Sequence, residues 1–163
     1  MPSIAETAAE MIQWVFPEHA GAPGQIHGGR MMQWITQGGT MAASRVAHGT
    51  VVLGAMDDID FLAPVKLGQI AILRAQVEYV GTSSLEVGVK VLAEIPWSGE
   101  VRHACTAFLT YVHLGPDLRP RPCPPYPPTT AGARRRWEAA VGRRAQRLER
   151  VKGLKAMLLN ERG

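Results

Sequence analysis

The feature that most constrains the fold of this chain is a change of hydrophobic period near residue 50. Residues 28–47 carry apolar side chains at the three- and four-residue spacing of one helix face, at Met31, Trp34, Ile35, Met41, Ala42 and Val46. Four later segments alternate apolar and polar residues instead, at 50–61, 71–79, 85–91 and 101–113. The sequence therefore predicts one long helix followed by four strands.

Short connections join the later strands. The segments Gly81–Ser84 (GTSS) and Pro96–Glu100 (PWSGE) have the length and composition of antiparallel hairpin turns. Such a sheet cannot bury its inner face against itself, so the helix must lie across it and the sheet must wrap the helix. Residues 5–15 fit either a helix or an edge strand, and the alternation of Ile12, Trp14 and Phe16 favours a strand at the end of that segment.

The long helix carries two glycines in its interior and a glycine after its end. Gly38 and Gly39 each cost ~1 kcal/mol relative to alanine, which predicts that another backbone packs closely there. Gly49 follows His48 and is expected to mark the end of the helix.

The C-terminal part of the chain differs in composition from the rest. Residues 118–130 (LRPRPCPPYPPTT) read as a stiff, extended, proline-rich linker, and residues 131–159 read as a helix. We therefore expect a main domain over residues 1–118, a linker over 119–130 and a basic helix over 131–163.

The net charge of +4 hides a strong asymmetry. From Thr130 onward there are ten Lys/Arg and three acidic residues, whereas the remainder has eight Lys/Arg and eleven acidic residues. A polyphosphate-bearing ligand and a nucleic acid are candidate partners for such a segment, and a solvated helix face is the plainer alternative. Only one aromatic residue, Trp137, stands among the arginines, too few for stacking along a nucleic-acid strand, which makes nucleic acid an unlikely partner.

The remaining composition indicates a reduced, cytoplasmic, globular protein. Cys105 and Cys123 are in different settings without a metal-ligand pattern, so two free thiols are expected. The first ten residues lack the basic start of a secretory signal, and no apolar run has the ~20 residues of a membrane span. Asp58 and Asp60 share a strand face, but no His or Cys joins them, so no metal and no cofactor are expected.

Several short motifs, in this order and spacing, resemble the hotdog-fold acyl-CoA thioesterases. None is specific alone, and together they cover roughly residues 8–150. The motifs are Phe16-Pro17-Glu18, Gly24-x-x-His27-Gly28-Gly29, Asp58-x-Asp60-Phe61-Leu62-Ala63-Pro64-Val65-x-x-Gly68, Gly81-Thr82-Ser83-Ser84-x-Glu86-Val87 and Ala107-Phe108-x-Thr110-Tyr111-Val112, followed by Pro124-Pro125 and a basic helix.

The resemblance implies a fold, a substrate and an assembly. The fold would be the hotdog fold, in which a curved antiparallel sheet wraps a central helix and protomers pair into dimers, here within a tetramer or hexamer. The substrate would be acyl-CoA, bound at the dimer interface. The backbone N–H groups of Gly28 and Gly29 would stabilise the oxyanion that forms on the thioester carbonyl. Thr82, Ser83 and Ser84 offer hydroxyl and N–H groups for coenzyme A, or else form only a hairpin turn. Arg134 and Arg135 are candidates to contact its phosphates, or else form part of a solvent-exposed helix face.

Two positions depart from the family pattern. Many relatives have an Asp or Glu seven residues after the second glycine, where this chain has Thr36, and an Asn in the preceding loop, where it has Gly21. His27 is a candidate base or carbonyl-polarising group, or else a residue that only orders the start of the helix. Glu18 and His19 are further acid–base candidates from the loop.

Two functions follow from this pattern. The first is hydrolysis of acyl-CoA to a carboxylic acid and CoA. The second is a CoA- or acyl-CoA-binding subunit that has lost its chemistry, because losing a positioned base costs ~10²–10⁴ in rate.

Overall fold

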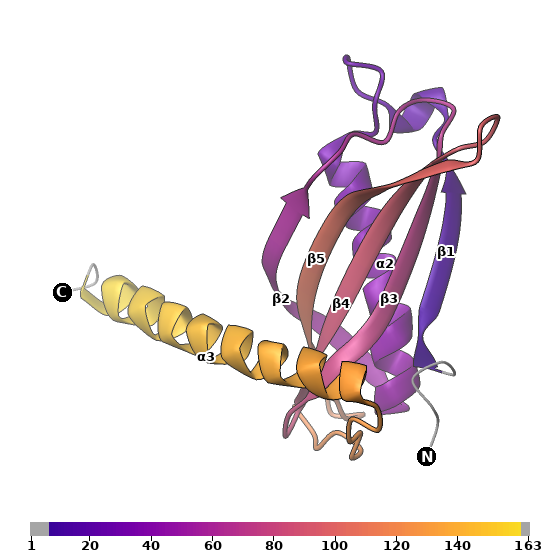
Figure 1. The fold of residues 1–163 in the computed structure, drawn as a ribbon. Helices are drawn as coiled ribbons and strands as arrows, with labels where there is room; N and C mark the ends of the chain where they lie inside the picture. Colours follow the sequence, from indigo (N-terminus) through magenta and orange to yellow (C-terminus); the bar gives the residue numbers. More distant parts are fainter. Residues whose placement is uncertain (1–6, 161–163) are drawn as a thin grey trace. The chain divides into compact units, whose positions relative to one another are not determined.

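The computed structural model describes residues 7–160, and Figure 1 shows how their helices and strands are arranged. Residues 1–6 and 161–163, which include the ends of the predicted N-terminal segment and C-terminal helix, lie outside the described residues. The elements in chain order are β1 (Ala9–Trp14), the short 3-10 helix η1 (Pro17–His19), α2 (Gly28–Ala47), β2 (Thr50–Phe61), β3 (Ile70–Val80), β4 (Ser84–Ile95), β5 (Glu100–Leu114) and α3 (Ala131–Asn160).

The five strands form one antiparallel sheet in the order β1-β3-β4-β5-β2, with α2 against one face (behind the sheet in Figure 1). This confirms the predicted α+β class, the position of the long helix and the strand that ends the N-terminal segment. Alternate residues of β4 are buried beneath α2, at Leu85, Val87, Val89, Val91 and Ala93. Burial of each large apolar side chain of this core stabilises the fold by about 1.5–3 kcal/mol.

The ends of α2 are fixed by its flanking residues. His27 is the N-cap, in an extended conformation (φ −67°, ψ 135°), and its ring accepts a hydrogen bond from the helix. At the other end His48, and not Gly49, adopts the left-handed conformation, with φ 51°. Gly49 is needed for space, because a Cβ there would lie 2.8 Å from Nε2 of His113. The glycine after the helix therefore serves packing against β5 and does not form the left-handed cap.

The prediction that another backbone packs closely on Gly38 and Gly39 is wrong, because the atoms nearest to both glycines belong to side chains. A Cβ on Gly39 would lie 2.6 Å from the hydroxyl oxygen of Tyr111, a fully buried side chain of β5. A Cβ on Gly38 would meet only ordinary contacts, 3.5 Å to Met11 Sδ and 3.7 Å to Ala75 Cβ. The lack of a side chain at Gly39 therefore leaves space on the surface of α2 for the ring of Tyr111 from β5.

The chain divides into two compact units, Met1–Tyr126 and Pro127–Gly163. In the first unit, the N–H of Arg121 donates to the carbonyl of His113 (3.0 Å), and the N–H of Cys123 donates to the carbonyl of Thr82 (2.8 Å). The Tyr126 hydroxyl is hydrogen-bonded to that of Thr7 at 2.7 Å. The first half of the proline-rich segment is thus bonded to the sheet unit, and the predicted domain boundaries stay a prediction.

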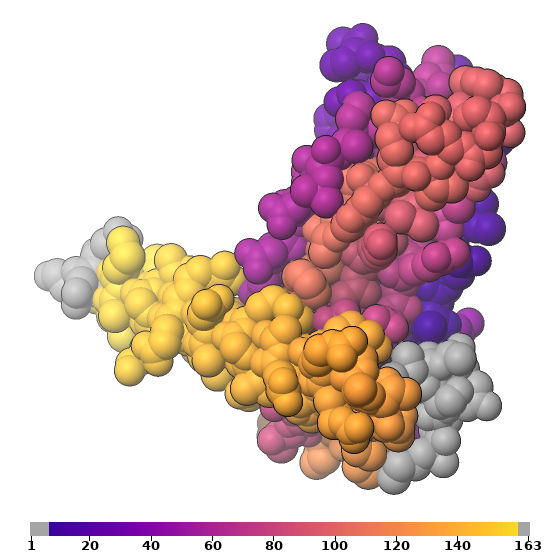
Figure 2. All heavy atoms as spheres, in the orientation of Figure 1, coloured from indigo at the N-terminus to yellow at the C-terminus, as the bar shows by residue number. Residues whose placement is uncertain are grey.

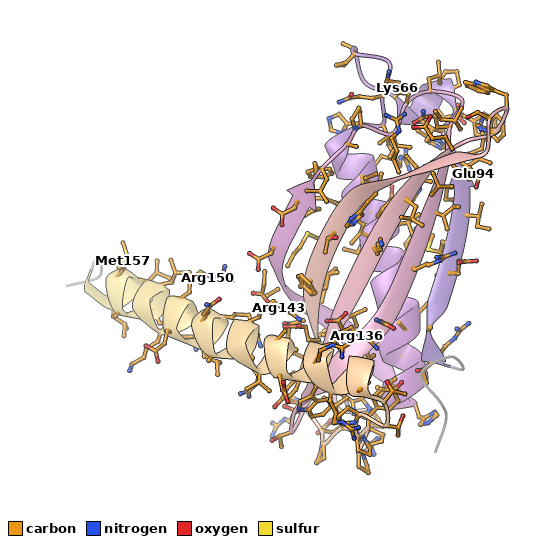
Figure 3. All side chains as sticks on the ribbon, viewed as in Figure 1. Lys66, Glu94, Arg136, Arg143, Arg150 and Met157 are labelled. Atoms are coloured by element: carbon orange, nitrogen blue, oxygen red, sulfur yellow. The ribbon has the colours of Figure 1, made fainter. Side chains whose placement is uncertain are left out.

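The second unit contains α3, which Thr130 caps by accepting a hydrogen bond from the N–H of Ala133 at 3.1 Å. Figure 3 labels three of its arginines, Arg136, Arg143 and Arg150, along the helix. Among residues 7–160, no helix is long and apolar enough to cross a membrane.

Candidate functional site

A pocket of about 360 Å³ lies at the N-terminal end of α2, and we call it the apolar pocket. Its walls come from the loop before α2, the end of β2 and the start of β5. Backbone hydrogen bonds hold these walls together, from Ile26 to Val65 (2.8 Å) and from Leu62 to Ala104 (2.8 Å). The lining residues are Gln25, Ile26, Gly28, Met31, Phe61, Leu62, Ala63, Pro64, Val65, Ala104 and Cys105.

The two glycines at the start of α2 differ in their N–H groups. The N–H of Gly29 donates to Nδ1 of His27 at 3.1 Å. The N–H of Gly28 makes no hydrogen bond to any of residues 7–160, and Gly28 lines the apolar pocket. Because helix N-terminal N–H groups attract negative charge, the free donor for a ligand oxygen in this protomer is that of Gly28.

A second, polar pocket of about 380 Å³ lies on the other side of the same helix start. In both of its histidines Nδ1 accepts a backbone hydrogen bond, from Gly29 in the case of His27 and from Phe16 (3.2 Å) in the case of His19. A neutral imidazole that accepts at Nδ1 carries its proton at Nε2, so both rings offer a donor and neither offers a free base nitrogen. The lining residues are Glu18, His19, Ala20, His27, Gly29, Arg30 and Gln33.

Thr36 is bound within its own helix. Its hydroxyl donates to the carbonyl of Gln33 at 2.9 Å, and its carbonyl accepts from the Tyr111 hydroxyl at 2.9 Å. Its proton is engaged with a backbone carbonyl, and no side-chain base among residues 7–160 is hydrogen-bonded to this hydroxyl, so nothing there activates it as a nucleophile. Gly21 lies in the loop beside His27, where a Cβ would be 3.9 Å from Cδ2 of the ring.

The residues predicted to bind CoA are not gathered in one protomer. The turn Thr82–Ser84 joins β3 to β4 at the end of the sheet where α2 finishes, because His113 contacts both Ser83 and the position after α2. Gly28 is near Phe61 at the other end. Cys105, which lines the apolar pocket, and His113, which contacts the turn, are eight residues apart along β5 (113 − 105). At 3.3 Å per residue this separation is about 26 Å. Arg134 and Arg135 are exposed residues of α3, in the second unit.

The apolar pocket contains one ionisable side chain, Cys105, which the sequence did not single out as functional. Burial, with a smaller effect of the Asp60 carboxylate, raises the pKa of this thiol to about 11. Cys105 is therefore protonated at neutral pH and is not an activated nucleophile. The segment Phe61–Val65 was recognised as a motif, but its role as a pocket wall had no signal in the sequence. Among residues 7–160, no three His, Cys, Asp or Glu side chains gather as a metal site would require.

Comparison with known proteins identifies the family. Residues 23–96 match the thioesterase superfamily. The chain is 34% identical over 143 residues to the protein named uncharacterized acyl-CoA thioester hydrolase YkhA of Bacillus subtilis, covering 88% of this chain and 83% of that protein. It is also 34% identical to mouse acyl-coenzyme A thioesterase 11 over 146 residues, although it spans only 25% of that longer protein. This chain belongs to the acyl-CoA thioester hydrolase family.

Solved structures agree with this assignment. An acyl-CoA hydrolase from Staphylococcus aureus, described in complex with butyryl coenzyme A, coenzyme A and coenzyme A disulfide, superimposes with a TM-score of 0.89 at 28% identity over 96% of both chains. A hexameric acyl-CoA thioesterase in its apo form superimposes with a TM-score of 0.87 at 27% identity, over 91% of this chain and 95% of that one. The hotdog fold implied by the sequence motifs is confirmed.

Proposed function

We propose that this protein hydrolyses acyl-CoA thioesters at the start of α2. The observation that carries the proposal is the apolar pocket, which leads to the unpartnered N–H of Gly28. An apolar pocket with one directed donor suits a thioester, whose acyl group is apolar and whose carbonyl oxygen becomes anionic during attack by water.

In the proposed reaction, the thioester oxygen accepts a hydrogen bond from the Gly28 N–H. Water adds to the carbonyl carbon and loses a proton to a base, and collapse of the tetrahedral intermediate breaks the C–S bond. The sulfur leaves as the CoA thiolate and takes up a proton, and the acyl group leaves as a carboxylic acid. Because the start of α2 carries positive partial charge, it stabilises the oxyanion of the intermediate.

The base must come from outside the apolar pocket, because the only ionisable side chain that lines this pocket among residues 7–160 is Cys105, and Cys105 is protonated. Glu18, in the polar pocket, is a carboxylate whose oxygens make no hydrogen bond to residues 7–160. Within one protomer it is the best base candidate beside α2. In this scheme Nδ1 of His27 accepts the N–H of Gly29, and its Nε2–H is a second donor for the ligand. Thr36 takes no part.

The proposed enzyme is a dimer built on β2, within a tetramer or hexamer. β2 is an edge strand of the sheet, and its Val52 and Leu53 are 42% and 45% exposed. On α2, Met32 and Met41 are each 39% exposed. Pairing at this edge would cover backbone and apolar groups that a single protomer leaves open. A second subunit would also be needed to bring Thr82–Ser84 near a Gly28 N–H.

One observation favours the alternative function, an acyl-CoA-binding subunit without catalysis. This chain has Thr36 where many relatives carry Asp or Glu, and Gly21 where many carry Asn. The Thr36 hydroxyl, moreover, donates its hydrogen bond to the carbonyl of Gln33 in its own helix. The apolar pocket and the Gly28 donor would still serve binding. This reading retains the ligand and removes the hydrolysis.

A free-thiol release assay with purified protein over acyl-CoA chains of increasing length tests the proposal, with CoA binding measured in parallel by calorimetry. Saturable thiol release supports hydrolysis. Binding of CoA or acyl-CoA without thiol release supports the binding subunit. Neither binding nor release at millimolar ligand would overturn both functions.

A further inference from the structure

Near the end of β5 lies a buried histidine, His113, to which the proposed reaction gives no part. We propose that His113 is a positioning residue for coenzyme A. In this role its ring holds residues 119–123, which we call the strap, against the turn Thr82–Ser84. The inference rests on the proposed function, in which this turn contributes to the CoA site.

His113 joins three segments that are distant from one another in the chain. Its backbone N–H donates to the carbonyl of Ser83 at 2.9 Å, and its own carbonyl accepts the N–H of Arg121 at 3.0 Å. Nδ1 of its ring is 3.0 Å from the carbonyl oxygen of Pro122. Because a carbonyl oxygen can only accept, Nδ1 carries the proton of this bond. On its other side the ring faces the chain after α2, where a Cβ on Gly49 would lie 2.8 Å from Nε2.

The strap depends on this ring because it has few other attachments. Pro120 and Pro122 have no N–H to donate. The N–H of Cys123 donates to the carbonyl of Thr82 at 2.8 Å, which links the strap directly to the turn. The ring bond to Pro122 lies one residue before that link, and it is the only hydrogen bond that a side chain among residues 7–160 makes to the strap. Loss of the ring should therefore loosen the strap beside the turn.

The turn that the strap contacts is open to a ligand. Thr82 is exposed, Ser83 and Ser84 are half-buried, and the N–H of Gly81 closes the turn by donating to the carbonyl of Ser84 at 2.8 Å. None of the three hydroxyl groups has a hydrogen-bond partner among residues 7–160. Figure 2 shows atoms of the turn and of the strap at the surface at this end of the sheet. Three hydroxyls that can donate and accept suit the amide and phosphate groups of CoA.

The role proposed for His113 lies in binding and not in the chemical step. The turn is at the end of the sheet opposite to Gly28, so a loosened strap does not reach the N–H donor of the same protomer. Interactions that hold substrate and transition state equally change KM and leave kcat as it is. A merely structural role would lower stability and leave the affinity for CoA unchanged.

The test compares two variants of His113 in the full chain. His113→Asn keeps an N–H donor close to the place of Nδ1, whereas His113→Leu is apolar and has none. We expect His113→Leu to raise the Kd of CoA, measured by calorimetry, and the KM of thiol release by about 5–10-fold, with kcat unchanged. His113→Asn should stay within about twofold of the wild type. Hydrogen exchange of the strap amides should become faster in His113→Leu only.

Two further variants separate the ring from the fold. Gly49→Ala places a Cβ 2.8 Å from Nε2 and so displaces the ring without changing it. It should raise the Kd of CoA as His113→Leu does, and it carries the test if His113→Leu does not fold. Tyr126→Phe is the matched control, because it removes another side-chain hydrogen bond of the proline-rich segment, the one of 2.7 Å to the Thr7 hydroxyl. It should keep the wild-type affinity.

Wild-type affinity for CoA in both His113→Leu and Gly49→Ala would overturn this inference and leave the proposed function standing. Equal losses in His113→Asn and His113→Leu would also overturn it, because the donor would then not matter. An equal loss in Tyr126→Phe would do the same, since any loosening of the segment would suffice. A wild type that binds neither CoA nor acyl-CoA would overturn the proposed function, and this inference with it.

Discussion

The N–H of Gly29 donates to Nδ1 of His27 at 3.1 Å, so the second glycine of the His27-Gly28-Gly29 motif has its donor occupied by the histidine that precedes it. The same bond holds the His27 ring with its proton on Nε2. Of the two glycines, it is Gly28 whose N–H makes no hydrogen bond to residues 7–160. His27 can act there as a donor through Nε2 and not as a base.

Replacement of Gly28 by proline removes this N–H at a position that tolerates proline. Gly28 is the first residue of α2, and His27 already has the extended conformation that precedes proline (φ −67°, ψ 135°). We expect Gly28→Pro to fold and to lower kcat of thiol release by about 10²–10³-fold. Gly28→Ala keeps the N–H and is the control. Equal losses in both variants would show that the pocket shape, not the donor, matters.

The carboxylate missing from α2 can be added. We expect Thr36→Asp to raise thiol release by ~10-fold or more, short of the full ~10²–10⁴ of a tuned base, because the surrounding residues are not shaped for it. Thr36→Asn has the same size without the charge and should not raise the rate. Gly21→Asn would add the second missing group beside His27. If Thr36→Asp leaves the native rate unchanged or lowers it, the base lies elsewhere, and Glu18 is the next candidate.

The contact of Tyr111 with α2 predicts opposite effects at two adjacent glycines. Gly39→Ala would place Cβ 2.6 Å from the Tyr111 hydroxyl and should lower the free energy of unfolding by about 1–3 kcal/mol. Gly38→Ala meets no contact closer than 3.5 Å and should be neutral or stabilising by up to ~1 kcal/mol. Urea unfolding measures both. If the two variants are equally stable, the ring does not limit the space at Gly39.

Cys105 gives the stability a dependence on pH. Its pKa in the folded state is raised to about 11 from 9.0, so the folded protein holds this proton more tightly than the unfolded chain does. The stability from this group is fully present below pH 9.0 and is lost as the pH rises towards about 11. Between pH 8 and pH 10, we expect a smaller fall in the free energy of unfolding for Cys105→Ala than for the wild type. Parallel curves would contradict this.

Binding of CoA should weaken as salt rises if Arg134 and Arg135 contact its phosphates, because salt screens exposed charges. We expect the double variant Arg134→Gln, Arg135→Gln to bind more weakly at low salt and to show a shallower salt dependence. Lys152→Gln, Lys155→Gln removes the same charge elsewhere on α3 and is the control. Calorimetry at two ionic strengths measures the effect, and affinity independent of salt would exclude these contacts.

The sequence by itself determined the architecture. The period of 3.6 over residues 28–47 and the period of two after residue 50 record which side chains face the core, and burial of one face is what forms each element. The family followed from motifs that are local in the chain. These signals are readable because the residues that produce them are neighbours in sequence.

The tertiary structure decided the contacts between residues distant in the chain. The hydroxyl of Tyr111 fills the space at Gly39, 72 residues away in sequence (111 − 39). The ring of His113 fills the space at Gly49, 64 residues away (113 − 49). The apolar pocket likewise needs Gly28, Phe61 and Cys105 together. No periodicity records such pairs. A glycine that leaves space for a neighbouring side chain looks the same in the sequence as a glycine that allows a turn of the backbone.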